Sequence, residues 1–160
     1  MKLNSGEELA EKTRRHVGNA SPQAAVYMLG GKISYARLTD WEAYHIAKRE
    51  DGFEIILDEK YARSTDNLAF WVARAIGDVM TAGYMSEQWE TIPMGKEMRP
   101  RSDSCLFAYA FLMPANKVRE YVNTHSEHGY ISLEEMDEYF HVNGMSERRL
   151  KMLKLAVYKF

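Results

Sequence analysis

The chain has 160 residues, a length typical of one domain, and 46% of them are hydrophobic, which is enough to bury a core. Its formal net charge of −2 lacks the excess positive charge that general nucleic-acid binding requires. The single cysteine, Cys105, excludes an internal disulfide framework and a four-cysteine zinc site. No apolar run is long enough to span a bilayer and no signal region opens the chain, so we expect a soluble, cytoplasmic protein.

The first predicted element is a helix over residues 5–17. Ser5 and Glu8 have the spacing of a capping box, in which each side chain accepts a hydrogen bond from the other residue's backbone N–H. Gly18 follows, and a glycine at this position commonly ends a helix. We therefore expect a helix that begins at Ser5 and ends before Gly18.

The next segment, residues 21–64, has an irregular, strand-like pattern. It contains two short runs, over residues 43–49 and 53–57. The pair Asp51-Gly52 lies between them and supplies the positive φ angles of a two-residue turn. The two runs therefore predict a β-hairpin.

The strongest helical pattern spans residues 66–82. Its apolar residues recur at intervals of three and four and form one continuous stripe, namely Leu68, Trp71, Val72, Ala75, Ile76, Val79 and Met80. Thr65 or Asp66 is expected to cap this helix, and Gly83 to follow its end. Residues 86–101 are expected to form a loop.

Further helices are predicted in the C-terminal half, over residues 102–113, 115–123, 132–141 and 146–154. Ser132 and Glu135 have capping-box spacing, and Ser146 is expected to cap the last helix. The last two helices resemble a helix-turn-helix in outline. Because the first of them is acidic, a packing role is favoured over DNA reading.

The order of these elements, together with one local motif, resembles a known family. The motif is Phe107-Ala108-Tyr109-Ala110-Phe111-Leu112-Met113-Pro114, which follows the long helix. It is similar to the E-A-N-x-F-A-x-x-L-L-M-P motif of the ImmA/IrrE family of zinc metallopeptidases. The resemblance implies an α+β, zincin-like fold, with a small β-sheet or hairpin packed on a helical core and a C-terminal helical tail. It implies a single domain over residues 1–160, with a peptidase core over 1–114 and the helical tail over 115–160.

The family's long helix carries A-H-E-L-G-H, whose histidines bind zinc while the glutamate activates the metal-bound water. In the same register of this chain, Arg74 replaces the first histidine, Ala75 the glutamate and Asp78 the second histidine. The family's third ligand, a glutamate, falls on Asp103. An arginine cannot ligate zinc and repels it, and an alanine cannot take a proton from water. The resemblance therefore implies no catalytic residue, no metal and no cofactor in this chain.

The replaced positions have a physical alternative to zinc. Arg74 and Asp78 lie one turn apart on the predicted helix, and Asp103 should approach from the neighbouring helix. An arginine between two carboxylates supplies the positive charge that zinc supplies in the family, so we predict a charged, hydrogen-bonded cluster that links the two helices. The simpler interpretation is a solvated helix face, on which arginine–aspartate pairs at this spacing are common.

Other side chains are candidates for metal or partner binding. His125 and His128 flank Glu127 and could chelate a metal, but a solvated loop is the favoured interpretation. A buried structural role is favoured for Cys105, because the sequence places no base near it. The candidate partner-binding residues are Trp89, in the predicted loop, and Glu134, Glu135 and Glu138, on the acidic helix.

Together these features predict a catalytically inactive, metallopeptidase-like regulatory protein of phage or mobile-element origin. It would bind and inhibit or relieve a protein partner. The resemblance implies a helix-turn-helix repressor, on which family members commonly act, or a host regulatory or defence protein. One alternative is an active metallopeptidase with an atypical metal site that uses Asp78, Asp103 and a histidine. A second alternative is a nucleic-acid binder that uses the basic residues of the last helices, which are Arg148, Arg149, Lys151 and Lys154.

Overall fold

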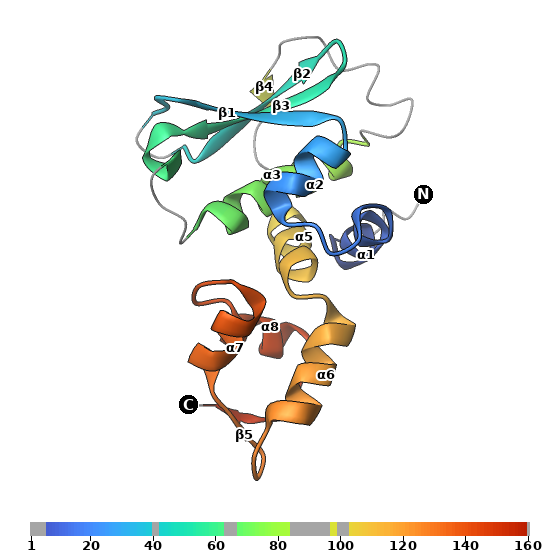
Figure 1. Ribbon diagram of the computed structural model, residues 1–160, viewed down its shortest axis with the longest axis vertical. Coiled ribbons are helices and arrows are strands. Elements are labelled where there is room, and N and C mark those ends of the chain that lie inside the picture. The colour runs from blue at the N-terminus through green and yellow to red at the C-terminus, as the bar shows by residue number, and fades with distance from the viewer. Residues whose placement is uncertain (1–5, 40–41, 63–66, 84–96, 99–102, 160) are drawn as a thin grey trace.

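The computed structural model describes residues 6–39, 42–62, 67–83, 97–98 and 103–159. Figure 1 shows a sheet at one end, a layer of helices beneath it and a helical tail at the other end. The α+β prediction is confirmed, with a small sheet packed on helices and a tail made of helices. Every helix in the described part of the chain is too short or too polar to cross a bilayer.

The elements follow one another as α1 (Gly6–Val17), α2 (Pro22–Met28), β1 (Gly31–Ala36), β2 (Tyr44–Arg49), β3 (Gly52–Asp58), the 3-10 helix η1 (Glu59–Ala62), α3 (Leu68–Thr81), β4 (Glu97–Met98), α5 (Asp103–Leu112), α6 (Ala115–His125), β5 (Tyr130–Ile131), α7 (Leu133–Phe140), α8 (Ser146–Met152) and β6 (Tyr158–Lys159). The predicted helices are confirmed, with ends displaced by a few residues. The short elements α2, η1, β4, β5 and β6 were not predicted.

The strand-like interpretation of residues 21–64 is wrong at its beginning, where α2 forms instead. The Ser21 hydroxyl accepts a hydrogen bond from the backbone N–H of Ala24 at 3.2 Å and so caps the helix. Pro22 occupies the first turn, where its missing N–H breaks no helical hydrogen bond. These two residues were the local signal for a helix.

The predicted hairpin is confirmed as β2 and β3, which pair antiparallel. Arg49 lies opposite Gly52, so the connecting turn is one residue earlier than predicted. β1 pairs parallel with the other edge of β3, and the strand order is β1-β3-β2-β4. Most of the predicted 86–101 loop lies outside the described residues, but Glu97–Met98 forms β4 and pairs with β2.

A first hydrophobic core lies between the sheet and the helices α1, α2, α3 and α5. The predicted stripe of α3 supplies its centre, with Val72, Ile76 and Val79 each fully buried. Gly77 allows α3 and α5 to approach closely, because a Cβ added there would lie 2.9 Å from the Cβ of Phe107. The cap of α3 was predicted at 65 or 66, outside the described residues. In the structure the N-cap residue of α3 is Asn67, and its side chain makes no capping hydrogen bond.

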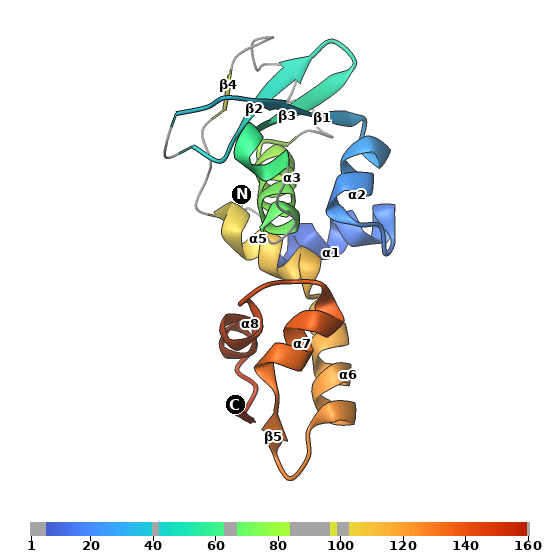
Figure 2. The same ribbon diagram turned by 60° about the vertical axis from the view of Figure 1, so that its left-hand side comes forward.

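A second hydrophobic core fills the tail, where α6, α7 and α8 group together below α5 (Figure 2). The Ser132 cap of α7 is confirmed by a hydrogen bond from the Glu135 N–H at 3.3 Å. The predicted Ser146 cap of α8 is wrong, because Met145 is the cap residue and Ser146 is already helical. The Asp137 carboxylate caps the start of α8 instead: it accepts hydrogen bonds from the Ser146 N–H at 3.0 Å and from the Ser146 hydroxyl at 2.6 Å.

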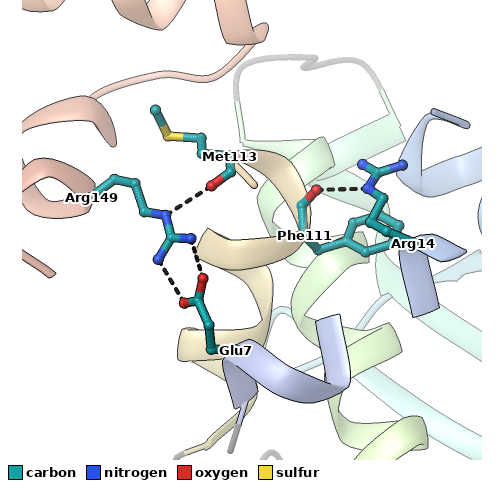
Figure 3. A network of polar contacts seen from close by, with 5 residues as sticks. All are labelled: Glu7, Arg14, Phe111, Met113 and Arg149. Atoms are coloured by element: carbon teal, nitrogen blue, oxygen red, sulfur yellow. Dashed lines mark hydrogen bonds and ion pairs between the residues drawn. The ribbon is translucent and has the colours of Figure 1, made fainter. Parts of the chain in front are cut away.

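Two arginines make long-range polar contacts near the junction of the two cores (Figure 3). Arg149 of α8 is fully buried, and its guanidinium donates to the two carboxylate oxygens of Glu7 at 2.6 and 2.8 Å and to the Met113 carbonyl at 2.8 Å. Arg14 donates to the Phe111 carbonyl at 2.9 Å, and burial lowers the pKa of Arg14 to about 10. Helix α1 is therefore tied to both the end of α5 and the tail.

Candidate functional site

Four polar side chains meet where β2, α3 and α5 come together. We name them the polar cluster: Tyr44 on β2, Arg74 and Asp78 on α3, and Ser104 on α5. The Tyr44 hydroxyl donates a short hydrogen bond to Oδ2 of Asp78. The Arg74 Nε donates to the Ser104 Oγ at 3.2 Å. The cluster thus joins the sheet to α3 and α3 to α5.

Burial controls the electrostatics of the polar cluster. Asp78 and Ser104 are 0% exposed and Tyr44 is 2% exposed. Burial raises the pKa of Tyr44 well above its ordinary value of 10.0, and the negative charge of Asp78 and the hydrogen bond to it act in the same direction. The charge of Arg74 and the Ser104 hydroxyl oppose this shift. Tyr44 therefore stays protonated at physiological pH and serves as a hydrogen-bond donor.

The local sequence explains how each member reaches the polar cluster. Arg74 and Asp78 lie one helical turn apart and share a face of α3. Tyr44 begins β2 and is buried, two residues before the buried Ile46, so both point to the core side of the sheet. The Arg74 guanidinium also lies 5.7 Å from the ring centroid of Trp71, one turn earlier on α3.

Of the predicted cluster of Arg74, Asp78 and Asp103, the structure describes the side chains of Arg74 and Asp78. Arg74 does link α3 to α5, but through Ser104. Asp103 begins α5, and its side chain lies outside the described residues. The alternative interpretation of a solvated helix face is wrong for Asp78, because this side chain is completely buried. The sequence analysis missed Tyr44 and Ser104, although Ser104 is the immediate neighbour of Asp103.

Zinc does not fit the residues of the polar cluster. The guanidinium of Arg74 carries a permanent positive charge and offers no lone pair. Asp78 is the one carboxylate of the polar cluster, and Ala75, which is 0% exposed, has no atom that can ligate a metal. Among the described residues, no group of three His, Cys, Asp or Glu side chains is close enough to hold a metal ion. We therefore assign no metal chemistry to these positions.

The structure describes the surroundings of His125, His128 and Cys105, the other candidates from the sequence. His125 stacks on Tyr121, with 4.0 Å between ring centroids, and its Nδ1 lies 3.1 Å from the Tyr121 carbonyl oxygen. His128 occupies a turn with a φ of 51°. Cys105 is only partly buried, so the expectation of a buried thiol is wrong.

The candidate partner-binding residues fall in two places. Trp89 lies outside the described residues. Glu134, Glu135 and Glu138 are exposed on α7, while Met136 of the same helix is fully buried in the tail core. The acidic side chains thus form the solvent face of an amphipathic helix.

Comparison of the chain with protein-family models, with curated proteins and with solved structures found no match.

Proposed function

We propose that the chain is a catalytically inactive, metallopeptidase-like regulatory protein of a phage or another mobile element that acts by binding a protein partner. The partner we propose is a helix-turn-helix repressor or a host regulatory or defence protein. Binding would inhibit or relieve that partner by occupancy, which needs a complementary surface and no chemical step. The proposal rests on the ImmA/IrrE resemblance and on the polar cluster.

The polar cluster is the observation that carries the proposal. Two of its four members, Arg74 and Asp78, lie at register positions that the resemblance assigns to zinc ligation. The Arg74–Ser104 hydrogen bond connects α3 to α5, the two elements that a metal would connect, and the buried Tyr44–Asp78 hydrogen bond ties α3 to β2. Ala75 cannot act as the general base. A scaffold held together in this way keeps its shape without a metal, and a binding function requires nothing more.

The two alternative functions meet specific obstacles. An atypical metallopeptidase would have to hold its metal next to Arg74, whose permanent positive charge lies one turn from Asp78 on the same helix and repels a cation. A nucleic-acid binder that uses α8 would lose one of its basic residues, because Arg149 is buried against Glu7. The exposed glutamates of α7 would also repel a phosphate backbone next to α8.

Zinc binding by a rebuilt motif tests the scaffold. The variant Arg74→His/Ala75→Glu/Asp78→His restores the family's residues on α3. After incubation with zinc and dialysis, we expect stoichiometric zinc in this variant and substoichiometric zinc in the wild type, measured by elemental analysis. The control Asn116→His/Glu120→His places a histidine pair at the same spacing on the exposed face of α6, and it should lose its zinc on dialysis. A folded rebuilt variant that holds no more zinc than this control contradicts the metallopeptidase-like scaffold.

Partner capture tests the mode of action. The tagged wild-type protein is used to capture partners from the natural host, and each captured protein is incubated with it and measured by intact mass spectrometry. We expect a stable complex in which the partner keeps its full mass, with or without a chelator. Chelator-sensitive fragments of the partner would instead establish a peptidase and overturn the proposal.

A further inference from the structure

We infer that a groove beside α1 binds an acidic amphipathic helix of a partner protein. This inference rests on the proposed partner-binding function and assigns it a surface and a partner chemistry. The groove has a volume of about 580 Å³. α1 and α2 belong to the layer of helices between the sheet and the helical tail (Figure 1). The described residues that line the groove come from α1 and from the ends of α2 and α3: Leu9, Lys12, Thr13, Arg15, His16, Leu29, Met80 and Gly83.

The floor of the groove is apolar. Leu9, Leu29 and Met80 line it and also belong to, or pack against, the first hydrophobic core. Leu9 and Met80 keep part of their side-chain surface exposed, and a methionine adapts its flexible side chain to the shape of a partner. Tyr27 and Met28, which immediately precede Leu29, are 59% and 54% exposed.

The rim of the groove is positively charged. Every ionisable side chain in the described lining is basic, and all three of them, Lys12, Arg15 and His16, are exposed on α1. The acidic residues Glu8 and Glu11 of the same helix do not line the groove. This local charge contrasts with the net charge of −2 of the whole chain. It therefore favours an acidic partner over a neutral or basic one.

The shape of the lining favours a helical partner. Leu9, Thr13 and His16 follow one another at intervals of four and three residues, so one long face of α1 forms a wall of the groove. An incoming helix presents apolar residues at the same intervals and can lay that stripe between α1 and Met80. Acidic residues flanking its stripe would then lie beside Lys12 and Arg15.

Peptide binding provides the test. The probe is a fluorescently labelled amphipathic helical peptide with leucines at i, i+3, i+4 and i+7 and glutamates elsewhere, and the matched peptide has lysines in place of the glutamates. We expect the glutamate peptide to bind about tenfold more tightly in fluorescence anisotropy, and less tightly as salt is raised. In methyl NMR spectra, its binding should shift the signals of Leu9, Leu29 and Met80.

Charge reversal locates the binding surface. Lys12→Glu/Arg15→Glu should weaken binding of the glutamate peptide about tenfold, whereas Arg119→Glu/Arg148→Glu, an equal charge change on exposed tail residues, should leave it within about twofold. Equal effects of the two variants, or equal affinities for the two peptides, would overturn the inference. So would self-association of the unliganded protein that Lys12→Glu/Arg15→Glu abolishes, because the groove would then bind a second copy. A captured partner that remains intact and bound to Lys12→Glu/Arg15→Glu would refute the groove while leaving the proposed function in place.

Discussion

The contact between Arg149 and Glu7 allows the connection between the two cores to be tested quantitatively. Glu7→Ala removes the carboxylate that accepts hydrogen bonds from both terminal nitrogens of the Arg149 guanidinium. The guanidinium is then left buried with the Met113 carbonyl as its remaining hydrogen-bond acceptor among the described residues. Because Arg149 is completely buried, its guanidinium can regain a partner only from water that enters the space left by the partly exposed Glu7 side chain.

The size of the effect follows from the burial of both partners. Removing one partner of a buried ion pair destabilises a protein by about 3–5 kcal/mol, because an uncompensated charge remains inside. The Glu7 side chain is 33% exposed, which lowers the strength of the pair relative to a fully buried one. We therefore expect Glu7→Ala to lower the free energy of unfolding by about 3 kcal/mol, at the lower end of that range. In an Arg149→Met background, the same substitution should cost less than about 1 kcal/mol, because no buried charge remains to be satisfied.

Urea unfolding measures both values. Trp71 packs against the first hydrophobic core, so its fluorescence reports on the unfolding of that core, while far-UV circular dichroism reports on all the helices together. Glu11→Ala, on the exposed side of α1, serves as the control. The reasoning is refuted if Glu7→Ala costs no more than Glu11→Ala, or if its cost is the same in the wild-type and Arg149→Met backgrounds.

Three further substitutions test other parts of the structure. Tyr44→Phe removes a buried hydrogen bond to a carboxylate and should lower the free energy of unfolding by about 2 kcal/mol at pH 7. Because folding raises the pKa of Tyr44 above its ordinary value of 10.0, the free energy of unfolding of the wild type should fall as the pH rises past that value. The difference in unfolding free energy between the wild type and Tyr44→Phe, measured by urea titration, should therefore narrow above pH 10. A difference that stays constant would contradict the role of Tyr44 as a buried donor. Gly77→Ala brings a Cβ to 2.9 Å from that of Phe107 and should cost about 2 kcal/mol in thermal unfolding, whereas a gain in stability would show that α3 and α5 can move apart. Asp137→Ala removes the carboxylate that accepts hydrogen bonds from the first turn of α8 and should lower the free energy of unfolding by about 1–2 kcal/mol. Amide hydrogens of α8 should exchange faster in this variant than in the exposed control Glu138→Ala. Equal exchange in the two variants would argue against this cap.

Local patterns were enough to predict the main helices and the hairpin. The apolar stripe of α3 recurs at the helical period, and its burial against the sheet is what that period indicates. Ser132 caps α7 as predicted, because capping depends on residues only three positions apart. The failure at α2 was also local: Ser21 and Pro22 marked a helix start that the surrounding strand-like pattern obscured.

The partners of the polar cluster depended on tertiary structure. The register of α3 identified Arg74 and Asp78 as neighbours, since both lie on one helix. Tyr44 and Ser104 come from a strand and another helix, and no spacing in the sequence relates them to α3. Which hydroxyl reaches which charged group is decided by how β2 and α5 pack against α3.

Arg149 is the clearest case of a residue whose surroundings depended on tertiary structure. In the sequence it is one of several basic residues on a short C-terminal helix, a pattern that suggests a solvated or phosphate-binding face. In the structure it is fully buried and paired with Glu7, which lies 142 residues earlier in the chain. The sequence alone determined that α8 is a basic helix. Only the docking of the tail on α1 and α5 decided that this arginine points inward, because burial is a property of the assembled surfaces and not of the helix itself.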